Sequence, residues 1–289
     1  MENQTQRKPR ILCLHGFRTS GEILKKLAGR LPQTVLEKLD LVFLDAPFPA
    51  EGKSDVEGIY DPPYYEWFQA NEDYTEYTNF EECLAYMEDY MLKHGPFDGV
   101  LGFSMGGMLA ALLPGMQEEG VALTKVPKIK FLIIISGAKF GGSKYGAPKL
   151  AANALSSPIK CPSLHFIGEK DFNKEDGTVL LESFVDPVVI HHTKGHTIPK
   201  LEPRRDLIGP ARDLHGTRPG PDRNLTRARP GLARDLTRPA EDPPRTCPVG
   251  FRSSPEQVPG RSRSSLDDKA EETLLKFIEK IQAVPGHEE

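Results

Sequence analysis

The stretch FDGVLGFSMGGMLAALL (97–113) decides how this chain is organised, because it joins two kinds of pattern. Its first half is a short apolar run typical of a buried strand, and its second half repeats apolar residues at helical spacing. Ser104 lies at the junction, with Gly102 two positions before it and Gly106 two positions after it. This G-x-S-x-G pattern between a strand and a helix is the context of a nucleophile elbow. The pattern also occurs by chance in glycine-rich turns, so the rest of the chain has to support a catalytic role.

Five further apolar runs resemble the one that precedes Ser104. They are short, rich in β-branched residues and bounded by Gly, Pro or Asp, which is typical of strands buried on both faces of a parallel sheet. Stretches with helical periodicity lie between several of them. This alternation predicts the α/β class, with a doubly wound, mostly parallel sheet and helices on both faces. The predicted strands lie at 11–16, 39–47, 97–104, 128–137, 163–168 and 187–192, and the predicted helices at 22–31, 80–94 and 105–119.

The segment 202–265 differs from the rest of the chain in composition. It contains 13 arginines, no lysine, eight acidic residues and 11 of the 26 prolines, and Phe251 is its only aromatic residue. Such a segment cannot bury enough apolar surface to offset chain entropy, so we expect a disordered Arg/Pro-rich insertion. The amphipathic stretch 266–281 then reads as a helix of the interrupted domain. We expect one α/β domain formed by 1–201 and 266–284.

Composition also limits the compartment and the partners. The net charge of −4 does not indicate a nucleic-acid partner, and acids and prolines interrupt the arginines that would contact phosphates. No run approaches the roughly 18 apolar residues of a membrane helix, and the polar N-terminus lacks the apolar core of a secretory signal. The four cysteines show no metal-ligand spacing. We expect a reduced, cytoplasmic protein, with the nucleus as an alternative, and no membrane span, nucleic acid, metal or cofactor.

A serine hydroxyl is a weak nucleophile until a base accepts its proton, and that base needs an orienting acid. Hydrolases with a nucleophile elbow supply these groups in the order Ser, Asp, His, on loops that follow later strands. Asp171 follows the predicted strand at 163–168, and His196 follows the one at 187–192. We therefore predict Ser104, Asp171 and His196 as a catalytic triad.

Other acids and histidines fit these roles less well. Asp176 and Asp186 lie farther from a strand end, where a solvated surface role is expected. His191 and His192 are expected within a strand in a satisfied structural role. His165 lies inside another strand and is expected to point into the core or a helix layer.

Backbone N–H groups are the natural stabilisers of a developing oxyanion. The first N–H groups of a helix have no partner inside the helix, so the N–H of Met105 is one candidate. The loop LHGFRTSG (14–21) should supply the second, with Phe17 preferred and Arg18 next. His15 lies in the same loop, where we expect it to shape the loop through backbone hydrogen bonds rather than to act as a base.

Several motifs in order resemble the FSH-type serine hydrolases, an α/β-hydrolase group that includes fungal esterases and the ovarian-tumour-associated hydrolase, and most closely its plant members. The similarity spans about residues 8–201 and resumes at 266–281. The resemblance implies an α/β-hydrolase fold, the Ser104–Asp171–His196 triad and hydrolysis of carboxylic esters. The insertion is a departure from it. The motifs are LHGFRTSG (14–21), DAPFPAEGK (45–53), YDPPYYEWF (60–68), GFSMGG (102–107), SLHFIGEKD (163–171) and GHTIP (195–199).

The resemblance also implies that the segment before the helix at 80–94 forms part of an acyl pocket under a short lid. The predicted pocket residues are Arg18, Tyr64, Trp67 and Phe68, although packing over the sheet is an equally good role for the aromatic residues. A short lid favours small or linear acyl groups.

The leading interpretation is a serine esterase or thioesterase that acts on a small-molecule acyl ester or thioester through an acyl-enzyme. The alternative is a small-molecule receptor on a hydrolase scaffold that keeps the triad and turns over poorly or not at all. Turnover of p-nitrophenyl esters distinguishes the two.

Overall fold

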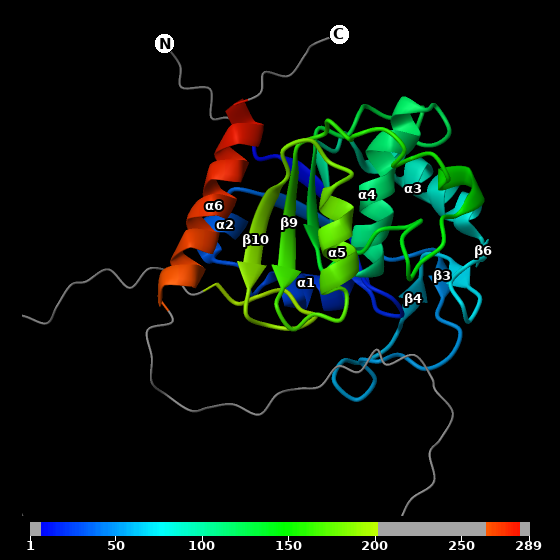
Figure 1. Ribbon diagram of the computed structural model, residues 1–289, viewed down its shortest axis with the longest axis horizontal. Helices are drawn as coiled ribbons and strands as arrows, with labels where there is room; N and C mark the ends of the chain where they lie inside the picture. Colours follow the sequence, from blue (N-terminus) through cyan, green and yellow to red (C-terminus); the bar gives the residue numbers. More distant parts are fainter. Residues whose placement is uncertain (1–6, 202–263, 284–289) are drawn as a thin grey trace, which may run out of the picture. The chain divides into compact units, whose positions relative to one another are not determined.

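The computed structural model describes residues 7–201 and 264–283, and Figure 1 shows them in colour. The predicted insertion at 202–265 lies outside the described residues, apart from its last two positions, which open helix α6 (Ser264–Ala283). Its predicted disorder and the predicted domain boundaries therefore remain predictions.

Six parallel strands form the central sheet, in the order β10-β9-β8-β7-β1-β2. The chain begins at the interior strand β1, adds β2 on one side of it and then adds the later strands one after another on the other side. The winding direction therefore reverses between β1 and β7, and loops at the carboxyl ends of such strands diverge to leave a crevice. The strands are β1 (Arg10–Leu14), β2 (Asp40–Leu44), β7 (Gly99–Phe103), β8 (Phe131–Ile135), β9 (Ser163–Gly168) and β10 (Val188–His192).

Helices cover both faces of this sheet (Figure 1). Alternate residues of β1 show why, because Leu12 and Leu14 belong to one buried cluster while Ile11 and Cys13 belong to the other. Both sets are wholly buried, as strands covered on two faces require. The doubly wound parallel α/β fold predicted from the sequence is confirmed. One face carries α3 (Phe80–His94), α4 (Met105–Glu118) and α5 (Lys174–Leu181), and the other carries α1 (Gly21–Ala28), α2 (Gln33–Leu36) and α6.

Helix α6 completes the second face from far along the sequence. Its buried side chains Leu274, Phe277 and Ile278 lie in the same cluster as the strand residues. Phe277 meets Phe131 of β8 edge to face, with 6.3 Å between ring centroids. The apolar stripe predicted for 266–281 is thus the packing face of α6.

The segment between β2 and α3 holds short antiparallel pairs that the sequence did not predict. β3 (Phe48–Pro49) pairs with β4 (Tyr65–Glu66), and β5 (Gln69–Ala70) pairs with β6 (Tyr77–Thr78). Strands of two residues are too short to show alternation, so only the turn-rich character of this segment was predictable. Helix α5 was missed as well, because it is short and contains Gly177. A 3-10 turn at Lys149–Ala151 is the remaining helical element in the part of the chain that the structure describes.

No helix among the described residues combines the length and the apolar character that crossing a membrane requires.

His165 of β9 lies in the core, as expected, with only 2% of its surface exposed. Its Nε2 lies 3.0 Å from Ser163 Oγ, and its ring meets that of Phe184. Burial lowers the pKa of His165 from 6.5 to about 3. The side chain is therefore neutral in the folded protein at pH values at which an unfolded chain would bind a proton.

We predict that His165 makes folding stability depend on acid. Between pH 6.5 and pH 3 the unfolded state binds a proton that the folded state does not, so the free energy of unfolding falls as the pH is lowered. Protonation of this one histidine in the unfolded state should lower the free energy of unfolding by about 2 kcal/mol between pH 7 and pH 5. Urea unfolding at both pH values should show a smaller loss in His165→Gln, whereas His94→Gln, at an exposed position, should keep the wild-type loss. An equal loss in all three proteins would contradict the prediction.

Candidate active site

Ser104 occupies a strained turn between β7 and α4. Its backbone has φ 55° and ψ −120°, and a non-glycine residue rarely adopts a positive φ without support from its surroundings. Two backbone hydrogen bonds hold the turn, because Ser104 N–H donates to Ile135 O and Met108 N–H donates to Ser104 O, each at 2.9 Å. The serine therefore heads the helix in a conformation fixed by the neighbouring strand.

The glycines on either side of Ser104 allow this turn to pack. A β-carbon on Gly102 would overlap the backbone of Gly106. A β-carbon on Gly106 would overlap the carbonyl oxygens of Leu14, at the end of β1, and of His15, in the loop that follows. The two glycines thus allow strand, helix and loop to approach closely at the level of the backbone.

The structure brings Ser104, Asp171 and His196 together. His196 Nε2 lies 2.8 Å from Ser104 Oγ, and His196 Nδ1 lies 2.9 Å from Asp171 Oδ1. Asp171 follows β9 and His196 follows β10, so the carboxyl ends of β7, β9 and β10 each contribute one of these residues. With a proton on Nδ1 donated to the carboxylate, Nε2 is free to accept the serine proton.

The environment of Asp171 favours its ionised form. Burial opposes ionisation, but the hydrogen bond and electrostatic attraction of His196 and the backbone N–H of Asn173 help to outweigh it, so the pKa of Asp171 is lower than usual. The Asn173 N–H donates to Asp171 Oδ1 at 2.8 Å. Because the Asp171 side chain is only 2% exposed, its charge acts on His196 with little screening by water.

Two aromatic rings pack against His196. The ring of Phe172 lies 4.2 Å from the imidazole, centroid to centroid, and that of Phe103 lies 5.2 Å away. Phe172 is 39% exposed, which makes it an apolar surface directly beside the imidazole. Phe172 was not predicted from the sequence, where its only signal is its position directly after Asp171.

The rival residues lie outside this cluster. Asp176 is in the first turn of α5, and Asp186 is in the loop before β10. His191 and His192 belong to β10, as expected. The satisfied role expected for His192 is wrong within the described residues, because both ring nitrogens are buried there without a hydrogen-bond partner. Burial lowers the pKa of His192 to about 4, so the ring is neutral.

His15 shapes the loop after β1, as the sequence analysis expected. Its Nδ1 donates to Gly16 O at 2.8 Å, and its Nε2 accepts from Ala46 N–H at 3.0 Å. The side chain is wholly buried, and burial lowers its pKa to about 4. Both nitrogens are thus occupied by backbone groups, which leaves no free nitrogen for a base.

The predicted oxyanion donors belong to two segments that meet at the serine. Met105 is the first residue of α4, and the loop that contains Phe17 approaches Ser104, since a β-carbon on Gly16 would lie 3.3 Å from Ser104 Cβ. Within residues 7–201 and 264–283, no hydrogen bond uses the backbone N–H of Phe17 or Met105. Both groups are therefore free to donate to a ligand.

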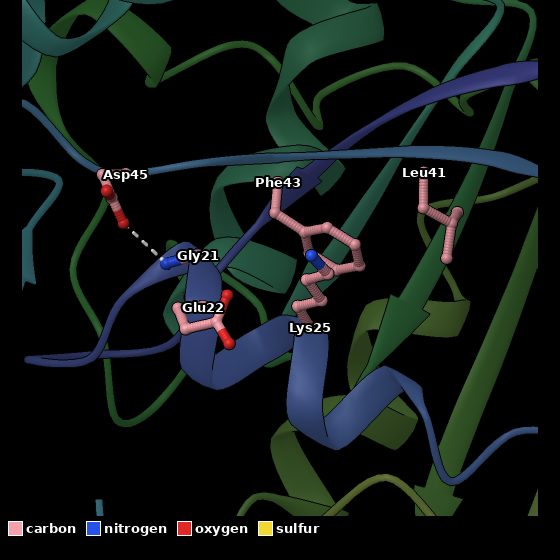
Figure 2. A pocket seen from close by; sticks show the side chains of 6 residues that line it. All are labelled: Gly21, Glu22, Lys25, Leu41, Phe43 and Asp45. Carbon is pink, nitrogen blue, oxygen red and sulfur yellow. Dashed lines mark hydrogen bonds between the residues drawn. The ribbon is translucent and has the colours of Figure 1, made fainter. Parts of the chain in front are cut away.

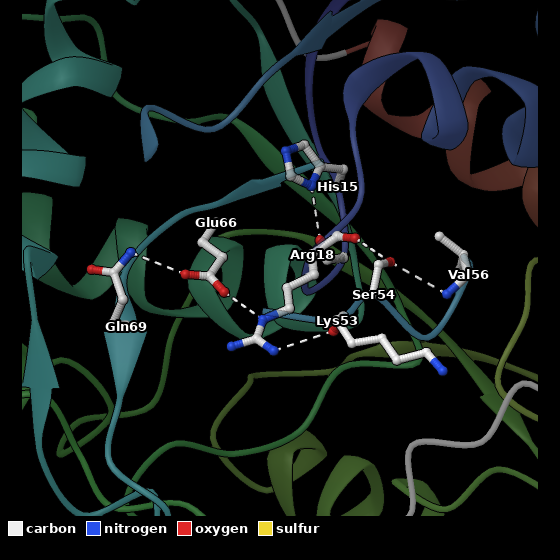
Figure 3. Close-up of polar contacts among 8 residues, drawn as sticks. His15, Arg18, Lys53, Ser54, Val56, Glu66 and Gln69 are labelled. Atoms are coloured by element: carbon white, nitrogen blue, oxygen red, sulfur yellow. Dashed lines mark hydrogen bonds and ion pairs between the residues drawn. The ribbon is translucent and has the colours of Figure 1, made fainter. Parts of the chain in front are cut away.

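The predicted pocket residues are mostly engaged with the protein itself. Trp67 and Phe68 are wholly buried, and Tyr64 OH donates to Tyr60 O at 2.5 Å. The guanidinium of Arg18 is paired with a carboxylate in the contacts that Figure 3 shows. This placement favours packing for the aromatic residues, the alternative named above, and gives Arg18 a partner within the protein.

A separate hollow lies between α1 and β2 (Figure 2) and contains none of the predicted triad residues. Asp45 Oδ1 accepts the N–H of Gly21 there, so the first turn of α1 already has a partner. The lining is mainly polar and open to solvent, and it does not resemble an acyl site. The lining residues are Gly21, Glu22, Lys25, Leu41, Phe43 and Asp45. No group of three or more His, Cys, Asp or Glu in the described part of the chain is arranged to hold a metal ion.

Comparisons with known proteins show the family of this chain. Residues 3–208 match the family described as Serine hydrolase (FSH1). The esterase OVCA2 of Bos taurus is 31% identical over 215 residues, which cover 68% of this chain and 92% of the bovine protein. The esterase OVCA2 of Homo sapiens is 30% identical over 219 residues, which cover 69% and 93%. Acyl-protein thioesterase 2 of Zea mays, a solved structure, aligns with a TM-score of 0.45 and 22% identity over 69% of this chain and 91% of its own.

We predict that Gly106→Ala destabilises the fold and disturbs the serine turn. The added methyl group overlaps carbonyl oxygens of backbone that cannot rotate away, so the melting temperature should fall by an amount equivalent to about 2 kcal/mol or more. Gly29→Ala is the matched control, because Gly29 has an ordinary helical φ of −61° and its nearest neighbour would lie 3.4 Å away. Thermal unfolding of both variants tests this prediction, which fails if they melt together.

Proposed function

Because the chain belongs to the FSH1 serine hydrolase family, we propose that it hydrolyses carboxylic esters or thioesters through an acyl-enzyme formed on Ser104. The family resemblance inferred from the sequence motifs is confirmed, and with it the class of enzyme. The observation that carries the proposal is the continuous hydrogen-bonded chain from Asp171 through His196 to Ser104.

In the proposed reaction, Ser104 Oγ attacks the acyl carbonyl while His196 Nε2 accepts its proton. Asp171 holds the imidazole in the required tautomer and stabilises the imidazolium that forms. His196 then protonates the leaving alcohol or thiol, which leaves the acyl group bound to Ser104. A water molecule, deprotonated by His196 in turn, attacks the acyl-enzyme. The bond between the acyl carbon and Ser104 Oγ then breaks, His196 returns the proton to Ser104 Oγ, and the acid is released.

Negative charge on the carbonyl oxygen is the main electrostatic demand of both steps. We assign its stabilisation to the backbone N–H groups of Phe17 and Met105, which are unused within the described residues and belong to the two segments that meet at the serine. Donors that are already oriented stabilise the oxyanion without reorganising as the charge develops.

The substrate class follows from the surface beside His196. Phe172 is partly exposed and packs on the imidazole, so an apolar group of the substrate can contact it. The segment between β2 and α3, residues 45–79, which we call the lid segment, contributes short strands and buried aromatic residues rather than a cap domain. We therefore propose small or linear acyl esters or thioesters as substrates.

We predict that a fluorophosphonate probe labels the protein at Ser104, since only an activated serine reacts rapidly with it. Labelling, read by peptide mass spectrometry, should disappear in Ser104→Ala together with hydrolysis of p-nitrophenyl butyrate. Labelling that persists in Ser104→Ala would exclude Ser104 as the activated nucleophile. Labelling at Ser104 without turnover on a chain-length series of esters would favour the receptor alternative.

We predict that Asp171→Asn lowers kcat by several orders of magnitude, because the amide cannot stabilise the imidazolium and favours the wrong tautomer. Asp176→Asn makes the same chemical change nearby, in the first turn of α5, and should retain wild-type kcat. His196→Ala should be at least as damaging as Asp171→Asn, since triad members act as a unit. Loss of activity in Asp176→Asn but not in Asp171→Asn would identify Asp176 as the acid.

A further inference from the structure

Three consecutive residues of the lid segment contact the loop after β1. Tyr65 N–H donates to Thr19 O at 2.7 Å, and Trp67 Nε1–H donates to His15 O at 2.8 Å. Between them, Glu66 pairs with Arg18. The lid segment thus runs along the loop that carries the Phe17 N–H. It forms hydrogen bonds with that loop near both ends, at His15 O and Thr19 O.

The Glu66–Arg18 ion pair is the charged contact between the lid segment and the loop after β1 (Figure 3). Arg18 Nε–H donates to Glu66 Oε1 at 2.5 Å, and Gln69 Nε2–H donates to Glu66 Oε2 at 3.1 Å. The side chain of Glu66 is 1% exposed, whereas that of Arg18 is 26% exposed. A buried carboxylate needs its partners, so Glu66 holds the guanidinium in one place.

The backbone of Arg18 is held in a conformation that it would not adopt alone. Its φ is 48°, in the left-handed region that disfavours residues with a β-carbon. Ser54 Oγ–H donates to Arg18 O at 2.6 Å, and Arg18 Nη1–H donates to Lys53 O at 3.2 Å. The side chain and the carbonyl of Arg18 are therefore both anchored, which maintains the strained turn.

This turn determines the direction of the adjacent peptide groups. The carbonyl oxygens of His15, Gly16, Arg18 and Thr19 all accept hydrogen bonds, so the loop cannot rotate freely. The N–H of Phe17, in the middle, donates to no acceptor within the described residues. The loop is thus fixed through its carbonyl oxygens, and one N–H remains available beside Ser104.

We propose that Glu66 is a positioning residue, which acts through Arg18 to aim the Phe17 N–H at the oxyanion. The inference rests on the proposed function, because it presupposes acyl chemistry at Ser104. The competing role for Arg18 is direct binding of an anionic substrate, in which case Glu66 would affect the affinity for substrate rather than the stabilisation of charge in the transition state.

The test measures kcat and KM of the Glu66→Gln variant of the full chain with p-nitrophenyl butyrate. We expect kcat to fall tenfold or more while KM stays within about twofold, because an oxyanion donor acts mainly in the transition state. Affinity for butylboronic acid, whose adduct with serine is tetrahedral and anionic, should fall by a similar factor. Affinity for p-nitrophenyl butyl ether, which has no carbonyl group, should not change, whereas a loose pocket would weaken both inhibitors.

Asp89→Asn is the matched control, since it makes the same change in an exposed ion pair with Lys93 and should keep wild-type kinetics. Ser54→Ala is the second variant, because it removes one hydroxyl anchor from Arg18 O and leaves the buried carboxylate paired. We expect it to lower kcat about threefold or more with the same pattern of inhibitor affinities. If Glu66→Gln does not fold, Ser54→Ala decides the outcome.

Wild-type kcat in a folded Glu66→Gln overturns the proposal, and so does a rise in KM with unchanged kcat. Where only Ser54→Ala folds, its wild-type kinetics overturn the proposal too. These outcomes are distinct from failure of the proposed function, which would show as loss of probe labelling or turnover in the wild-type protein itself.

Discussion

The rest of the site depends on one constraint, which is direct backbone contact where β7, α4 and the loop after β1 cross. No side chain of the described residues lies between the main chains there. Gly102 and Gly106 permit it, because a methyl group at either position would overlap main-chain atoms. The contact places the strained Ser104 turn beside Gly16. Ser104 and the backbone N–H groups near it are thereby brought together by the packing of the main chain, before any side chain contributes.

This contact lies at the point where the winding of the sheet reverses, between β1 and β7. Loops from the two strands meet where the sheet turns from one winding direction to the other, and β9 and β10 then deliver Asp171 and His196 at the same edge. Each chemical group thus comes from a different strand of one rigid sheet. Rigid support matters because displacement of a reacting group by about 1 Å can cost a hundredfold in rate.

The fold and the residues around Ser104 were predictable from the sequence for a physical reason. Strands buried on both faces leave continuous apolar runs, and residues such as Asp171 and His196 stand out at the ends of those runs. Phe172, by contrast, is adjacent in sequence to the acid but acts through its packing on His196, which no local pattern encodes. Likewise, the partnership of Glu66 with Arg18 joins positions 48 residues apart, and the two-residue strand that carries Glu66 shows no periodicity.

The position of α6 has a consequence for the order in which the chain is made. Leu274, Phe277 and Ile278 cover a face of the sheet that is complete in sequence by Leu201. A ribosome adds roughly 5–20 residues per second, so the 62 residues from 202 to 263 delay the arrival of this helix by roughly 3–12 s. During that interval α1 and α2 can already cover their share of this face, but the apolar patch that α6 covers in the folded protein stays exposed on the nascent chain. Exposed apolar surface of this kind is prone to aggregation and is what chaperones bind.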